Sequence, residues 1–269
     1  MNEPAALAPA NAPGSPRLSD ADIGKVLELL KGSTSIELKL MVENSPGEIL
    51  ARLGFDPVEA QPRQVYFFDT PDLALNKAGV IVRARRSAGG RGDTVVKLRP
   101  IDPQTISADL RRDPALKIEV DFMPGNYVCS ASFKGRCPSD QVLKVSDGSL
   151  PLKSLLTKTQ RAIYAAYAPD GIAMTSLVPL GPTFLLRIKK QPIEFDRLIT
   201  LELWLYPDGS RVLEISTAGL PEEGFQLAAH FKSYLAACGI PTEAATATKT
   251  AKALQYFAER LQDSGTTAS

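Results

Sequence analysis

The sequence predicts a mainly β protein of the α+β class, with an antiparallel sheet that carries helices at its start and at its end. Most segments after Ser33 alternate apolar and polar residues with the period of two that strands require. Turn residues separate several of these segments, as in Pro207-Asp208-Gly209-Ser210. Apolar residues at helical spacing occur mainly near the two ends of the chain.

Each element follows from its own residues. A helix is expected from Ser19 or Asp20, either of which can cap its first turn, to Gly32, which can end it. Shorter helices are expected at 46–53 and 139–145, and two more, at about 222–238 and 246–262, close the chain. Strands are expected at 35–42, 64–69, 79–87, 93–99, 116–122, 158–167, 172–178, 183–190, 198–206 and 211–217.

The domain organisation is simple. No linker or internal repeat divides the 269 residues, so residues 19–263 are expected to form one domain. Residues 1–18 are rich in Ala, Pro, Asn and Gly with almost no charge, which is typical of a disordered tail. Residues 264–269 are expected to be a flexible C-terminus.

Composition argues against several classes of protein. The chain has 31 Lys and Arg against 30 Asp and Glu, so it lacks the excess of positive charge typical of nucleic-acid binding. No apolar run is long enough for a membrane span, and the first residues do not resemble a secretory signal. Three cysteines are too few for a disulfide framework, so a cytoplasmic protein with reduced thiols is expected. With one histidine, any metal site would use carboxylates and a hard cation, Mg²⁺, Mn²⁺ or Ca²⁺.

The informative pattern is that several strands carry charge on one face. In Val82-Arg83-Ala84-Arg85, for example, the arginines share one face and the apolar residues share the other. The basic residues on such faces are Lys39, Arg83, Arg85, Lys97, Arg99, Lys117, Arg187 and Lys189. The acidic residues on them are Glu37, Glu119, Asp121, Glu202 and Glu214.

Two interpretations fit this pattern. A sandwich with one wet, charged face would show the same alternation and need bind no ligand. A barrel whose helices cover its apolar faces would instead turn the charges into its lumen. Same-face pairs of Arg and Lys repel each other, which favours an anion between them. Such a lumen would suit a polyphosphate with a divalent cation, because Arg binds phosphate oxygens and carboxylates bind magnesium.

The order of the motifs resembles that of a CYTH domain, of the triphosphate tunnel metalloenzyme superfamily. The resemblance covers roughly residues 33–217. It begins with Ser35-Ile36-Glu37-Leu38-Lys39, which is similar to the family's E-x-E-x-K strand. The later motifs are Tyr66-Phe67-Phe68-Asp69-Thr70-Pro71, Val82-Arg83-Ala84-Arg85, Lys97-Leu98-Arg99-Pro100, Glu119-Val120-Asp121, and Glu202 and Glu214 in the last strands.

The resemblance implies an eight-stranded antiparallel β-barrel, the triphosphate tunnel, with peripheral and C-terminal helices. Members of such families hydrolyse inorganic or thiamine triphosphate, or convert ATP to cyclic AMP, with Mg²⁺ or Mn²⁺. The chain would then act on a small-molecule triphosphate, as a monomer or homodimer. The implied substrate-binding residues are Lys39, Arg83, Arg85, Lys97, Arg99, Arg187, Lys189 and Arg161. The implied metal ligands are Glu37, Glu214 and Glu202, and the implied catalytic residues are Glu119, Asp121 and Lys39.

Two residues depart from the family pattern. Ser35 stands in place of the first Glu of E-x-E-x-K, and Ser216 stands where many members have a second Glu after Glu214. Both changes put a two-metal site in doubt. Three functions therefore stay open: divalent-cation-dependent hydrolysis of a triphosphate, which is favoured; a class IV-type adenylate cyclase; and a polyphosphate- or nucleotide-binding module without turnover.

Overall fold

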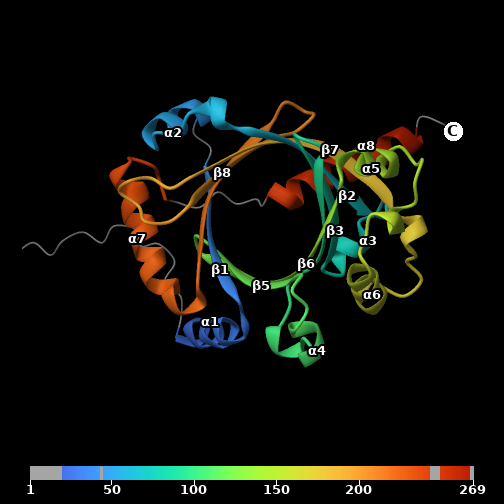
Figure 1. The fold of residues 1–269 in the computed structure, drawn as a ribbon, viewed down its shortest axis with the longest axis horizontal. Coiled ribbons are helices and arrows are strands. Elements are labelled where there is room, and N and C mark those ends of the chain that lie inside the picture. Colours follow the sequence, from blue (N-terminus) through green and yellow to red (C-terminus); the bar gives the residue numbers. More distant parts are fainter. Residues whose placement is uncertain (1–19, 43–44, 243–248, 267–269) are drawn as a thin grey trace, which may run out of the picture.

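The computed structural model describes residues 20–42, 45–242 and 249–266 (Figure 1). The strands are β1 Ser35–Val42, β2 Gln61–Asp69, β3 Val80–Ser87, β4 Arg91–Leu98, β5 Leu116–Met123, β6 Asn126–Pro138, β7 Val178–Lys190, β8 Ile199–Leu205 and β9 Arg211–Gly219. The α-helices are α1 Asp20–Gly32, α2 Pro46–Arg52, α3 Ala74–Lys77, α4 Ala108–Arg111, α5 Ser139–Ser146, α6 Lys158–Tyr167, α7 Gly224–Ala237 and α8 Lys249–Thr266. The predicted tail 1–18 and the last residues 267–269 lie outside the described residues.

The strands form a closed barrel in the order β1-β5-β6-β4-β3-β2-β7-β8-β9 (Figure 1). The predicted fold class, a mainly β barrel with peripheral and C-terminal helices, is confirmed. The barrel differs from the expected eight-stranded antiparallel one in two details. Nine strands build it within the described residues, and β1 pairs with β5 in parallel, with Glu37 opposite Asp121.

Helices cover much of the outside of the barrel. The apolar face of β1, with Ile36, Leu38 and Leu40, is buried in the same hydrophobic cluster as Leu30 of α1 and Phe231 of α7. Burying a side chain of this size contributes roughly 1.5–3 kcal/mol, so this packing decides which face of each strand turns outward. The opposite, ionic faces therefore turn toward the lumen, as the barrel interpretation predicts.

A second, smaller hydrophobic cluster lies inside the barrel at one end. It joins inward-facing residues of the strands, among them Val65, Phe67 and Trp204, to Ala253 and Leu254 of α8. In Figure 1 the first turns of α8 (red) lie within the ring of strands. The C-terminal helix thus fills one end of the lumen with its own apolar side chains.

Two predicted strands are wrong. The segment predicted at 158–167 is the helix α6, which begins with a capping box between Thr157 and Gln160. Gln160 is fully buried and donates from Nε2 to the carbonyl of Phe133, which ties the helix to the outside of β6. The segment at 172–178 contains a short 3₁₀ turn at Met174–Ser176, and β7 begins only at its last residue, Val178.

One whole strand was not predicted, and another begins earlier than expected. β6 places Cys129, Ala131 and Phe133 on its buried outer side, but short Ser, Ala and Cys side chains give a weak strand pattern. β7 extends upstream of the predicted 183–190 through Pro179 and Pro182, and prolines argue against a strand on sequence grounds. A register shift in β2, between Val65 and Phe67, accommodates this part of the ladder.

Of the remaining helices, the four-residue α3 and α4 are not predicted by the sequence, and the others agree with it. Those expected at 46–53, 139–145 and 222–238 are α2, α5 and α7. The last helix continues to Thr266, past the predicted end at 262, and residues 246–248 of that prediction lie outside the described residues. In the described part of the chain, no helix combines the length and the apolar character that crossing a membrane requires.

Candidate active site in the barrel lumen

The lumen holds a cavity of about 390 Å³, within the range of ligand pockets. It lies beside the end that α8 fills and opens at the other end, where Lys134, Lys189 and Ala218 are exposed. The predicted site residues that line it are Glu37, Lys39, Arg83, Arg85, Lys97, Arg99, Glu119, Arg187, Lys189, Glu202 and Glu214. Asp121 does not line the cavity surface, because it is fully buried beneath it.

Arg161 is the exception among the predicted binding residues. It lies on the helix α6, where its guanidinium donates to the carbonyl oxygens of Lys153 and Leu156. The family resemblance implied it as a phosphate ligand, but it does not line the lumen cavity, so the structure removes it from the candidate site.

Two lysines of the lumen were not predicted. Lys134 comes from β6, a strand that the residue pattern does not predict. Its same-face neighbours Ser130 and Ser132 could have indicated an inward polar face. Lys249 is the first residue of α8, and no pattern in the sequence places the start of that helix inside a barrel.

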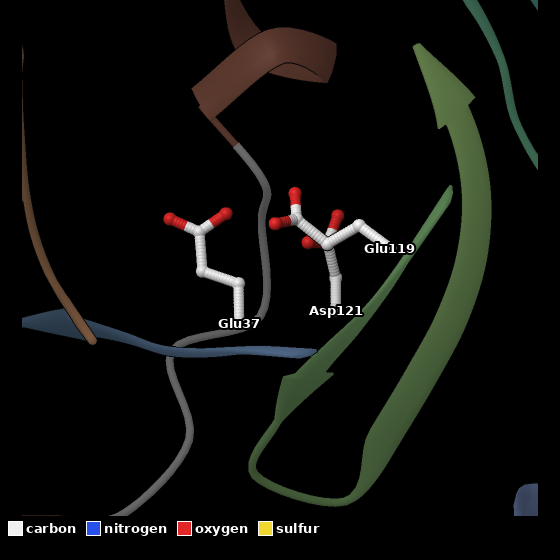
Figure 2. A group of neighbouring side chains, drawn as sticks. All are labelled: Glu37, Glu119 and Asp121. Carbon is white, nitrogen blue, oxygen red and sulfur yellow. The ribbon is translucent and has the colours of Figure 1, made fainter. Parts of the chain in front are cut away.

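Three carboxylates meet near the parallel pair β1–β5. Glu37, Glu119 and Asp121 each offer an oxygen, and these oxygens lie within 4.8 Å of one another. Figure 2 shows their carboxyl groups clustered on one side of the two strands. Oδ2 of Asp121 is buried and has no hydrogen-bond partner among the described residues. Three oxygen donors at this spacing fit a hard divalent cation such as Mg²⁺ or Mn²⁺.

Asp121 is the centre of a network of positive charges. Lys39 Nζ lies 2.7 Å from its Oδ1, while Lys97 Nζ and Arg99 Nη1 lie 3.5 and 3.4 Å from its Oδ2. Burial disfavours the charge of Asp121, but these three cations outweigh it and lower the pKa of the carboxyl to about 2. Asp121 therefore stays ionised and holds the basic side chains in place.

Burial and the neighbouring cations also lower the pKa of one of these lysines, Lys97. Burial, together with Lys39 and Arg99, lowers the pKa of Lys97 to about 8, although Asp121 opposes the shift. Lys39 responds in the opposite direction: burial disfavours its charge, but Asp121 and Glu37 raise its pKa above the usual value.

Arginines from β3 and β7 form the other wall. Arg85 pairs with Asp93, 2.9 Å from Nη2 to Oδ1, and Arg187 Nε lies 3.5 Å from Glu202 Oε1. Arg83 lines the same cavity with no ion-pair partner in the described residues, and its Nε is buried without a hydrogen bond. Burial and the neighbouring Arg85 lower the pKa of the Arg83 guanidinium to about 10.

A second pair of carboxylates, Glu202 and Glu214, lies near the filled end. Burial raises the pKa of Glu214, and Glu202 and Glu37 add to the rise, while Lys249 and Lys39 oppose it. Glu202 behaves differently, because Lys249 and Arg187 overcome its burial and lower its pKa. The lumen therefore has two acidic regions, and Lys39 pairs with Glu37 and Asp121 of the first while interacting electrostatically with Glu214 of the second.

The aspartate of Phe68-Asp69-Thr70-Pro71 has a structural role. Asp69 is buried at the end of β2 and accepts hydrogen bonds from the backbone N–H groups of Thr70, Leu75 and Asn76. It thereby fixes the turn that leads through α3 into β3, the strand that carries Arg83 and Arg85.

Comparison with known proteins gives a likeness of fold. No protein-family model matches this chain, and no curated protein matches it. Among solved structures, a candidate adenylate cyclase from Bacillus halodurans superposes with a TM-score of 0.58 at 15% identity, covering 82% of this chain and 97% of that one. A candidate adenylyl cyclase from Hippeastrum, described as having a dominant triphosphatase activity, gives a TM-score of 0.57 at 19% identity, covering 81% and 93%. The resemblance to the triphosphate tunnel is thus confirmed at the level of fold.

Proposed function

We propose that this chain is a divalent-cation-dependent phosphohydrolase that cleaves a triphosphate bound in the lumen of its barrel. The observation that carries the proposal is Arg83, a half-buried arginine of the cavity lining whose Nε is buried without a hydrogen bond and which has no ion-pair partner in the described residues. Burying an unpaired charge is costly, so a built position of this kind is expected where a ligand supplies the opposite charge.

Several observations indicate an anion with more than one charge. Arg83 and Arg85 come from β3, Arg187 and Lys189 from β7, and Lys97 and Arg99 from the end of β4, and all of them line the same cavity. A triphosphate presents oxygens along its length, and arginine can bind two of them at once. The fold of the Hippeastrum protein, whose description names a triphosphatase activity, agrees with this substrate class.

The residues present fit one divalent cation. Glu37, Glu119 and Asp121 would hold it, and Oδ2 of Asp121, which accepts no hydrogen bond from the described residues, would turn from Lys97 and Arg99 to the ion. When bound, such an ion would neutralise charge on the phosphate oxygens in the transition state. We assign the metal to these three residues rather than to the set Glu37, Glu214 and Glu202 that the family resemblance implies.

The chain's own residues would perform the rest of the reaction. A water oxygen forms a bond to the terminal phosphorus while the bridging P–O bond breaks, and the remaining diphosphate group leaves with the bond's electrons. Glu119 would orient the water and accept its proton, with Lys39 facing the developing charge. Asp121 would position Lys39, since a carboxyl with a pKa of about 2 is a poor proton acceptor. Positioning and charge supply most of the rate in phosphoryl transfer.

The experiment that tests the proposal is phosphate release from inorganic triphosphate with Mg²⁺ and with Mn²⁺. ATP is assayed in parallel for cyclic AMP. Metal-dependent release that Glu37→Gln lowers by at least about 100-fold is expected. The exposed Glu28→Gln on α1 is the matched control and should keep full activity. Formation of cyclic AMP would replace hydrolysis with the cyclase reaction.

Absence of turnover has two meanings, which ligand binding separates. A melting temperature raised by triphosphate would make the chain a binding module that has lost catalysis. If triphosphate does not change the melting temperature, the charged residues of the lumen have a purely structural role.

The closed barrel and its inner helix bring residues 35–42 and 249–266 into one body, which supports a single domain over 19–263.

A further inference from the structure

Glu202 and Glu214 are paired carboxylates at the filled end of the lumen. They are direct cross-strand partners on β8 and β9, and both side chains are buried. Two like charges so placed repel each other strongly unless a cation lies between them. The structure provides that cation from a distant part of the chain.

The ammonium group of Lys249 lies at both carboxylates. Its Nζ donates to Oε1 of Glu214 at 2.6 Å and to Oε2 of Glu202. It also lies 5.1 Å from the centre of the Trp204 ring, and Trp204 Nε1 donates to the same Glu202 oxygen at 3.2 Å. An ammonium group has three N–H donors, and two of them are directed at the acids.

Packing of α8 delivers this ammonium group to its site. The hydroxyl of Tyr206 donates to the carbonyl oxygen of Lys249 at 2.9 Å. One turn later, Ala253 and Leu254 are buried in the inner hydrophobic cluster. A cation that is fixed to the chain in this way does not dissociate, so a dissolved ion competes with a very high local concentration.

We propose that the ammonium group of Lys249 is the resident cation of the Glu202–Glu214 pair, and that this pair binds no divalent ion while Lys249 is in place. The tunnel then takes a single divalent ion, at Glu37, Glu119 and Asp121, and the count of one rests on the proposed function. Lys249 supplies positive charge at the filled end at any metal concentration. Oε2 of Glu214, buried and without a hydrogen bond to any described residue, is a latent ligand that removal of the lysine would free.

The test counts bound Mn²⁺ on the full-length chain, from the electron paramagnetic resonance signal of the free ion, without substrate. The wild-type chain should bind one Mn²⁺, and Lys249→Met should bind two. Lys249→Met combined with Glu214→Gln should return to one. Lys252→Met removes a lysine from the same helix, where its Nζ lies over the Tyr206 ring, and should bind one like the wild type.

Two results would overturn the inference. One is a wild-type chain that binds two Mn²⁺ and loses one in Glu214→Gln. The other is a folded Lys249→Met chain that gains no ion. Should Lys249→Met fail to fold, Glu214→Gln in the wild-type background decides: an unchanged count supports the inference, and a lost ion overturns it. A wild-type chain that binds no Mn²⁺ would contradict the proposed function and not the inference. In that case a Lys249→Met chain that binds one Mn²⁺ still supports the inference, and one that binds none overturns it.

Discussion

Lys39 Nζ lies 2.7 Å from Oδ1 of Asp121, and the two residues come from β1 and β5, the parallel neighbours in the barrel. Lys39 also reaches Glu37, at 3.0 Å from Nζ to Oε2. One lysine therefore connects two of the three carboxylates of the candidate metal site. The charge balance of the site and the pairing of these two strands depend on the same contacts.

Removing the buried charge of Asp121 should destabilise the fold. Asp121→Asn leaves Lys39 and Lys97 in a buried site without their common partner, so the free energy of unfolding at pH 7 should fall by about 3–5 kcal/mol. Urea denaturation measures the loss. Asp109→Asn, an exposed residue on α4 that pairs with Arg112, is the control and should change little.

The same variant gives a pH dependence with a defined sign. The pKa of Asp121 is lowered from 3.8 to about 2, so its contribution is complete above pH 4 and is lost as the pH falls toward 2. This pH-dependent part amounts to about 2 kcal/mol. The stability difference between wild type and Asp121→Asn should therefore narrow from pH 5 to pH 2.5, and an unchanged difference would contradict the assignment.

Replacement of Arg83 should separate binding from folding. Arg83→Met removes a half-buried charge that has no ion-pair partner in the described residues, so the melting temperature of the ligand-free chain should not fall. Affinity for inorganic triphosphate should decrease roughly 10- to 100-fold, as expected for one charge-assisted hydrogen-bond donor. Arg86→Met on the same strand is the control, because Arg86 bonds Gln64 outside the lumen and its loss should leave affinity intact.

Triphosphate binding should weaken in mild alkali. Because the pKa of Lys97 is lowered to about 8, its ammonium loses its proton above that pH, and affinity should drop about tenfold from pH 7 to pH 9. Calorimetry in the presence of EDTA removes any effect of a metal ion. Lys97→Arg stays charged over this range and serves as the reference, since protonation of the ligand affects both proteins alike. Equal pH profiles would contradict a lowered pKa of Lys97 at the bound triphosphate.

The inner hydrophobic cluster should contribute several kcal/mol to the free energy of unfolding. Leu254 of α8 is buried within it, and Leu254→Ala should lower the free energy of unfolding by about 2–5 kcal/mol. Leu261→Ala, in the same helix and 38% exposed, should cost much less. Similar losses for both variants in urea denaturation would indicate that α8 does not pack inside the barrel in solution.

Alternation of side chains predicted which residues share an ionic face, but it fitted a sandwich as well as a barrel, and the closed barrel followed from the family resemblance. Arg83, Lys97 and Glu214 were placed correctly, because an ionic residue two positions from another shares its face whatever the strand order. β6 was missed, and with it Lys134, since Ser and Ala alternate too weakly with Cys and Phe to indicate a strand.

Other features depend on contacts that no local pattern contains. The α6 segment has apolar residues that suit a strand as well as a helix, and the capping box at Thr157 decides the outcome. The parallel pairing of β1 with β5 joins residues more than eighty positions apart. Lys249 reaches Glu202 and Glu214 only because α8 folds back into the lumen.

Because α8 fills one end of the barrel, the lumen is accessible from the other end. A ligand that enters between Lys134 and Lys189 must leave through the same opening, so a product must dissociate before the next substrate can bind. A polyphosphate too long for the cavity could not be threaded through, and only its terminus would reach the carboxylates. Cleavage of such a chain would proceed inward from its tip, one end at a time, and never from the middle.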